Sequence, residues 1–235
     1  MANLTNLKER QARVVDIETI PNLEQWARLG EPEVTDKRLK DPVKIAEKKE
    51  ALIKKQLGDM ALHPVTGRIC AAAIVDINKS GQIVDRNGLV LDAVSDDSEN
   101  VLIRDLSAML DLSEWARPLI VTFNGISFDI PFIYGRCMML KARAPRPSIG
   151  DLTKRYSTRH HYDIRMMLNN WDSHAKGSLD YFENMIMDVR KDEPDYSKFL
   201  DYFKAGTQKK DILEPCIQHA EITADLYLRV SPYYN

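Results

Sequence analysis

Residues 118–123 (PLIVTF) form an apolar run that carries no charge. The turn-forming pair Asn124-Gly125 follows directly, and apolar residues then recur at helical spacing over 128–140. A short apolar run bounded by turn residues is typical of a buried strand. The other segments with strand character are 12–18, 67–78 and 83–91, the last two joined by a hairpin turn. Strands mixed with helices in this order predict an α/β fold with a central mixed β-sheet flanked by α-helices.

A charged segment separates the first two predicted strands. Within it, Asp41 is expected to cap a helix, Pro42 to occupy its first turn and Gly58 to end it. Helical spacing recurs over 98–112, 128–140, 177–187 and 214–230. With 235 residues, 44% of them hydrophobic, the chain is long enough to bury a substantial core. We therefore expect a single domain over residues 1–235, with a charged helical insertion at about 22–60.

Net charge and cysteine usage exclude several classes of protein. The formal charge of -2 argues against a protein that coats nucleic acid through overall positive charge, but not against a cleft that grips a few nucleotides. Cys70, Cys137 and Cys216 have no paired spacing, so neither a disulfide framework nor a structural zinc site is expected. We find no signal peptide and no run of membrane-spanning length. These features predict a soluble intracellular protein.

Two carboxylates end the first predicted strand, although its apolar residues predict that the strand is buried. Asp16 and Glu18 flank Ile17, so both side chains are expected on the same side of the strand. Buried together they would repel each other unless a cation balanced their charge, and divalent cations prefer oxygen ligands. A solvated strand end with two exposed acids explains the same pattern, and this stretch alone does not decide between the two.

Asp129 lies in the first turn of the helix that follows strand 118–123. Helix N-termini favour negative charge, so capping alone explains this acid. However, α/β sheets also present functional groups at strand ends. Here Gly125 permits a sharp turn, Phe128 offers a flat face beside the acid, and Asn124 can hydrogen-bond a sugar, a phosphate or its own turn.

Three motifs occur in order along the chain: Asp16-Ile-Glu18, Asn124-Gly-x-x-Phe-Asp129 and Cys216-x-x-His219-Ala-Glu-Ile-Thr. Together they resemble the motifs of the DEDD exonuclease superfamily. The sequence is most similar to the stand-alone 3'–5' exonucleases related to the proofreading domain of family-B DNA polymerases. The resemblance extends to 61–75, 161–168, 176–182 and 220–230, and so covers nearly the whole chain. It implies a ribonuclease H-like exonuclease fold.

The resemblance also implies a chemistry. Carboxylates of the three motifs would hold two divalent ions, Mg²⁺ or Mn²⁺, which straddle the scissile phosphate. By position, Asp16 would bridge both ions, Glu18 would complete the nucleophile-side ion and Asp129 would support the second. The implied substrate is a nucleic-acid 3' end, in the first place single-stranded DNA; RNA stays an open alternative, because nothing here reads a 2'-hydroxyl. The implied setting is the cytoplasm of a bacterium or phage-infected host, with replication or repair proteins as partners and no membrane.

The third motif departs from the family pattern. His219 takes the place of a metal-binding aspartate, and Pro215 takes the place of a tyrosine that orients water. We expect Pro215 in the first turn of the last helix, where its missing N–H is tolerated. As a ligand, His219 would favour Mn²⁺ over Mg²⁺; alternatively, the protein binds nucleic-acid ends or a protein partner without cutting. Residues considered for orienting the attacking water are Tyr162, Tyr181 and Glu214.

Several other residues receive expected roles. Asp163 and Ser178 are expected to cap helices, and the pair His160-His161 to lie in a loop. Lys176 is either a phosphate contact or a solvated lysine. The remaining predicted substrate-binding residues are Ile17, Thr19, Asn124, Gly125 and Phe128.

Overall fold

The computed structural model describes residues 10–36, 38–111, 118–172, 174–188, 195, 198–204 and 209–234. Its strands are β1 (Arg10–Pro21), β2 (Gly67–Asn78), β3 (Ile83–Val90), β4 (Leu119–Thr122) and β5 (His161–Asp163). Its helices are α1 (Leu23–Leu29), α2 (Pro42–Ala61), α3 (Asp96–Leu110), α4 (Asp129–Leu140), α5 (Ile149–Leu152), α6 (Ile164–Leu168), α7 (Leu179–Met187), α8 (Phe199–Lys204) and α9 (Lys210–Tyr234).

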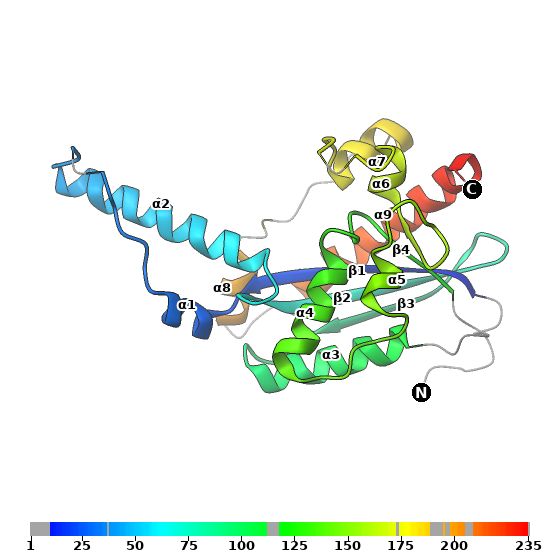
Figure 1. Cartoon of the computed structure of the whole chain (residues 1–235), viewed down its shortest axis with the longest axis horizontal. Helices are drawn as coiled ribbons and strands as arrows, with labels where there is room; N and C mark the ends of the chain where they lie inside the picture. Colours follow the sequence, from blue (N-terminus) through cyan, green and yellow to red (C-terminus); the bar gives the residue numbers. More distant parts are fainter. Residues whose placement is uncertain are drawn as a thin grey trace.

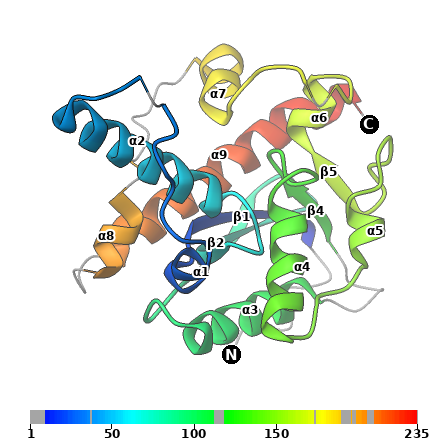
Figure 2. The same ribbon diagram turned by 60° about the vertical axis from the view of Figure 1, so that its left-hand side comes forward.

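The strands form one mixed sheet in the order β3-β2-β1-β4-β5. The pairs β1–β2 and β2–β3 are antiparallel, whereas β1–β4 and β4–β5 are parallel. Helix α9 crosses one face of this sheet, while α3 and α4 cover the other (Figures 1 and 2). The predicted α/β fold with a central mixed sheet flanked by helices is therefore confirmed.

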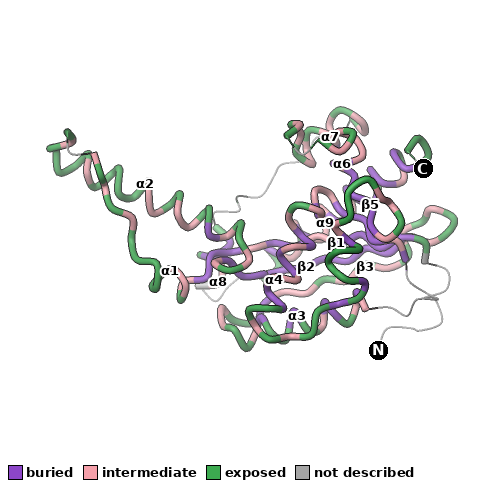
Figure 3. The backbone as a smooth tube through the Cα atoms, viewed as in Figure 1, coloured by how far each residue is buried: buried purple, intermediate pink, exposed green. Residues whose placement is uncertain are grey.

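The core lies between these layers and is concentrated on β1 and β2 (Figure 3). Strand β2 is buried from Gly67 to Ile77 without the alternation of a half-exposed strand, because helices cover both of its faces. Small side chains at Ala71, Ala72 and Ala73 lie in this buried run. The three cysteines are free, in line with the prediction of no disulfide framework, and all three are buried. Over the described ranges, no helix is both long enough and apolar enough to span a membrane.

Helices α1 and α2 form the predicted charged insertion, and α2 projects away from the sheet (Figure 1). Asp41 caps α2 through the Val43 N–H, and Pro42 occupies its first turn, as predicted. The prediction that Gly58 ends the helix is wrong: α2 continues to Ala61, and Leu62 is its C-cap. A single glycine lowers helix stability by only about 1 kcal/mol, which the flanking turns outweigh. That the whole chain makes one domain stays a prediction.

Other element bounds also differ from expectation. Strand β1 extends three residues beyond Glu18, so the two acids lie inside the strand and not at its end. Helix α9 begins at Lys210, which places Pro215 beyond the first turn and not within it. An interior proline removes one backbone hydrogen bond, here to the Asp211 carbonyl, and the length of the helix outweighs that loss. His161 is part of β5 and not of a loop.

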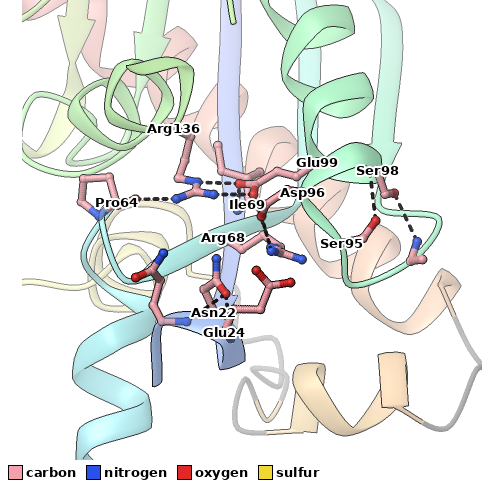
Figure 4. A network of polar contacts seen from close by, with 12 residues as sticks. Asn22, Glu24, Pro64, Arg68, Ile69, Ser95, Asp96, Ser98, Glu99 and Arg136 are labelled. Atoms are coloured by element: carbon pink, nitrogen blue, oxygen red, sulfur yellow. Dashed lines mark hydrogen bonds and ion pairs between the residues drawn. The ribbon is translucent and has the colours of Figure 1, made fainter. Parts of the chain in front are cut away.

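A buried carboxylate, Glu99 of α3, joins three segments on the α3–α4 side of the sheet (Figure 4). Its oxygens accept from the Arg136 guanidinium of α4 at 2.8 and 2.7 Å, and from the Ile69 N–H of β2 at 2.9 Å. Arg68, also buried, lies 3.3 Å from the same carboxylate. Arg136 in turn donates to the Pro64 carbonyl at 2.9 Å. This network fixes the start of β2 against α3 and α4.

Replacing Glu99 with glutamine should destabilise the fold by about 3–5 kcal/mol, because it leaves the buried Arg136 guanidinium without a counter-charge. The measurement is the free energy of unfolding from urea titrations at neutral pH. The matched control is Asp105→Asn on the same helix, whose pair with Arg104 is exposed and should change stability by less than about 1 kcal/mol. Equal effects of the two substitutions would contradict this role for Glu99.

Candidate active site

The acids of the first motif lie where β1 extends beyond its neighbour β4. The parallel ladder ends at the pair Val14–Val121, and β4 itself ends at Thr122. On the edge of β1 that faces β4, the N–H of Ile17 therefore has no strand carbonyl to donate to. Asp129, in the first turn of α4, takes its place: its Oδ1 accepts from the Ile17 N–H at 3.2 Å. The chain topology thus brings the first and second motifs into direct contact.

Helix α9 adds the third motif. His219 Nδ1 lies 3.2 Å from Glu18 Oε1 and 3.9 Å from Asp16 Oδ2. Asp16, Glu18 and His219 each offer a ligand atom, and these atoms all lie within 4.8 Å of one another. One turn earlier on α9, the Cys216 thiol lies 3.6 Å from Asp16 Oδ2. Sequence reasoning did not assign Cys216 to the site. The signal that could have done so is its i, i+3 spacing from His219, which places both side chains on one face of the helix.

Burial raises the proton affinity of all three acids. Desolvation and the charge of Glu18 raise the pKa of Asp16 to about 7. Desolvation also raises the pKa of Glu18, while desolvation followed by the charge of Asp16 raises that of Asp129 well above its usual range. Burial likewise raises the pKa of the Cys216 thiol, which therefore stays a donor. A divalent cation would reverse this penalty, and carboxylate oxygens with one imidazole nitrogen are a suitable ligand set.

Neither acid that follows His219 on α9 replaces the missing aspartate. Glu221 is paired with Arg86 of β3. Asp225 is exposed and lines a separate surface hollow with Ile186 and Met187. His219 is therefore the α9 side chain that reaches the two carboxylates of β1.

The turn from β4 to α4 is braced by residues of the neighbouring β5–α6 segment. Asp163 caps α6, as predicted, and its oxygens also accept from the N–H groups of Asn124 and Ile126 at 3.0 and 2.9 Å. Arg165 donates to Asn124 Oδ1 at 3.0 Å. This hydrogen bond fixes the orientation of the Asn124 side-chain amide.

Gly125 is required for a different reason from the predicted sharp turn. The left-handed residue of the turn is Asn124, with φ 66°. A Cβ on Gly125 would lie 2.2 Å from Thr122 Oγ1, the atom that accepts the Gly125 N–H at 3.0 Å. The glycine thus permits a close approach of backbone to side chain.

The other predicted substrate-binding residues lie in different environments. Ile17 is buried in the core, so only its backbone borders the site. Thr19 is half-buried beside a β-bulge that follows Glu18. Phe128 is half-buried at the N-cap of α4, with its ring 5.5 Å from that of Phe132. Lys176 is exposed just before Ser178, which caps α7 as predicted.

The residues considered for orienting water are not held at the acid cluster. Tyr162 is buried, and its ring packs on Tyr227, eight residues after His219 and so about 12 Å further along α9. Its hydroxyl has no hydrogen-bond partner among the described residues. Tyr181 is exposed on α7 with its ring against Phe182, and Glu214 is exposed on α9.

The sequence pattern of a protein family described as a predicted 3'-5' exonuclease related to the exonuclease domain of PolB matches residues 61–234. The chain belongs to this family. The matched range contains Asp129 and His219 and begins after Asp16 and Glu18. Membership makes the chain a predicted 3'–5' exonuclease, a hydrolase whose substrate is nucleic acid, and exonucleases of this kind generally use divalent metals. No functionally curated protein matches the sequence.

The fold of this exonuclease-family chain is also found in a solved polymerase structure. The family B DNA polymerase from the hyperthermophilic archaeon Pyrobaculum calidifontis matches with a TM-score of 0.58 and 14% sequence identity. The match covers 95% of this chain and 25% of the polymerase, so the chain spans about a quarter of that protein's length. The predicted ribonuclease H-like exonuclease fold is thereby confirmed.

The metal-free exonuclease-family protein should lose stability as the pH rises. Burial and the charge of Glu18 raise the pKa of Asp16 from its ordinary value of 3.8 to about 7 in the fold. The folded state therefore holds the proton more tightly, and stability present at about pH 4 is lost as the pH rises to about 7. In chelator, the urea midpoint of the wild type should fall across this window more steeply than that of Asp16→Asn. Saturating Mn²⁺ should reduce the difference, and identical profiles without metal would contradict the burial argument.

Proposed function

We propose that the protein hydrolyses phosphodiester bonds at the 3' ends of single-stranded DNA, with divalent ions held by Asp16, Glu18, Asp129 and His219. The observation that supports this proposal is the convergence of β1, α4 and α9 on one cluster. Three elements far apart in the sequence contribute acids and an imidazole to it. Glu18 and Asp129 are buried and Asp16 is half-buried, and none of these carboxylates has a lysine or arginine partner among the described residues. Such a set is costly to keep ionised unless cations bind it.

Each side chain has a distinct part in holding the ions. Asp16, between Glu18, Asp129 and His219, would contact both ions, while Glu18 and the neutral His219 ring would complete one and Asp129 the other. The Cys216 thiol, at 3.6 Å, holds the Asp16 carboxylate in position. When bound, the ions would lower the pKa of an attacking water and stabilise charge on the phosphate.

The substrate side of the proposal rests on the β4–α4 turn. Asn124 offers an oriented N–H donor, which suits a phosphate or sugar oxygen, and Phe128 offers a half-buried ring near Asp129. Lys176 supplies a cation on the segment tied to Asn124 through Arg165. RNA as substrate is an alternative outcome of the same assays, since no described contact is specific for the absence of a 2'-hydroxyl.

A second candidate function is end binding without cleavage. At 3.2 Å from Glu18, a protonated His219 would pair with the carboxylates and take the place of a cation. Pro215 supports the same alternative, because it cannot orient a water by hydrogen bonding as a tyrosine would.

The two functions are separated by a hydrolysis assay on 5'-labelled single-stranded DNA with Mn²⁺, with Mg²⁺ and in chelator. The proposed exonuclease predicts metal-dependent shortening from the 3' end, faster with Mn²⁺. End binding without cleavage predicts that the labelled strand is bound but not shortened in any of the three conditions.

A further inference from the structure

A pair of aromatic rings, exposed Tyr156 and half-buried Trp171, lies in the connections on either side of β5 and α6. Tyr156, in the α5–β5 connection, is 75% exposed, and its ring centroid lies 5.3 Å from that of Trp171, which follows α6. The Arg155 guanidinium lies 5.8 Å from the centre of the Tyr156 ring. Arg155 also donates to the Trp171 carbonyl at 2.9 Å, and so joins the two segments. Two rings and a planar cation are therefore held together at the surface.

The backbone at both rings is in the left-handed region. Tyr156 has φ 59°, Trp171 has φ 64°, and Asn170 before it has φ 49°. Bulky residues adopt this conformation rarely, because the Cβ then crowds the backbone. Burial of the ring would normally compensate, yet the Tyr156 ring is mostly in solvent. Strain that packing does not explain is characteristic of binding sites.

The charge around the pair favours a polyanion. Over 151–160 and 169–177, the described cations are Lys154, Arg155, Arg159 and Lys176, and the carboxylates are Asp151 and Asp172. Four positive and two negative side chains leave a local charge of +2, on a chain whose formal net charge is -2. All four cations are exposed. Lysine and arginine side chains of this kind neutralise phosphates of a nucleic-acid backbone.

Arg165 connects this surface to the candidate active site. Besides Asn124, its guanidinium donates to the carbonyls of Ala175 at 2.7 Å and Gly177 at 3.2 Å. The segment that carries Lys176 is thereby tied to the turn that precedes Asp129. β5 also pairs directly with β4, so the strand that follows the Tyr156 segment lies beside the strand that leads to the turn before Asp129.

We propose that Arg155, Tyr156 and Trp171 form a base-stacking surface for single-stranded nucleic acid, which holds nucleotides some distance from the 3' end while that end lies at the acid cluster. The proposal rests on the proposed function, which supplies the strand. Every base has a flat aromatic face, so stacking on such rings tolerates any sequence. Lys176 and Asn124 would contact the backbone between the two sites. A strand long enough to contact both the acid cluster and the rings should therefore bind the protein more tightly than a short strand.

The experiment measures fluorescence anisotropy of labelled DNA with the full chain in chelator, which prevents hydrolysis. A strand of about 16 nucleotides should bind more tightly than one of about 4. Tyr156→Ala and Trp171→Ala should each weaken binding of the long strand by about 5-fold or more and leave the short strand unchanged. Tyr156→Phe, which keeps the ring, should bind as the wild type does. The matched control is Tyr233→Ala, which removes a tyrosine that is 79% exposed elsewhere.

Hydrolysis of the short strand with Mn²⁺ tests the proposed function separately, since in this proposal the short strand occupies the acid cluster without contacting the rings. Wild-type affinity of Tyr156→Ala for the long strand, or equal affinity of the wild type for both strands, would overturn the stacking surface whether or not the short strand is cut. Length-dependent binding that is lost in Tyr156→Ala would support the surface, even if hydrolysis failed in every metal.

Discussion

Asp16→Asn should abolish hydrolysis in Mn²⁺, with a loss of more than about 100-fold, because removal of even an outer partner of a metal ligand costs 10–100-fold. Asp16 is the side chain that lies between the other members of the cluster. Its Oδ2 is 3.9 Å from His219 and 3.6 Å from Cys216, and its charge raises the pKa of Asp129. Asparagine keeps an acceptor for the thiol but removes the negative charge that binds the ions.

Stability should change in the opposite direction to activity. Because ionised Asp16 is unfavourable in the metal-free fold, the asparagine variant should be at least as stable as the wild type at pH 7 in chelator. Loss of activity is then not loss of folding. Asp225→Asn, which changes an exposed carboxylate of α9 outside the cluster, serves as the matched control and should keep the wild-type rate. If Asp16→Asn cleaved as fast as the wild type, the cluster would not be the catalytic site.

His219→Asp should raise Mg²⁺-supported hydrolysis by about 10-fold or more and reduce the preference for Mn²⁺. Imidazole suits Mn²⁺ better than Mg²⁺, whereas a carboxylate at the same position supplies the hard oxygen and the extra negative charge that Mg²⁺ requires. The wild type should also lose activity below about pH 6, since a protonated imidazole cannot bind a metal. In the aspartate variant, this loss should be smaller.

The control for this variant is His219→Asn, which has a polar side chain without charge or imidazole and should lower the rate with both ions. The measurement is the ratio of initial rates in Mn²⁺ and Mg²⁺ on one labelled strand, at several pH values. Equal rates of the wild type in both ions, unchanged in His219→Asp, would show that His219 packs beside the site without binding metal.

Local patterns sufficed to predict the frame of the fold, whereas the membership of the cluster was implied by the resemblance to the exonuclease family. The apolar runs that became β2 and β4, and the turn that leads to Asp129, are each specified by a few adjacent residues. Asp16 and Glu18 were recognised through alternation along a strand, which fixes the side of the sheet without knowledge of its partners. The order of the three motifs then indicated which segments meet.

Features that depend on distant contacts were not predictable in the same way. The start of α9 at Lys210 depends on tertiary packing of its first turn against β3. Leu213 packs so closely on Gly88 that a Cβ added to Gly88 would lie 2.6 Å from Leu213 Cδ1. The bracing of Asn124 by Arg165 joins residues 41 positions apart, and neither residue signals the other. The pairing of Tyr156 with Trp171 depends on backbone angles that the residue types disfavour.

The most direct test of the metal centre is a crystal soaked in Mn²⁺ and measured at a wavelength where manganese scatters anomalously. The structure predicts manganese at the cluster, with Asp16 and Glu18 oxygens and His219 Nδ1 as ligands and Asp129 beside a second ion. Absence of manganese there at saturating concentration, with His219 paired to Glu18 instead, would contradict the account.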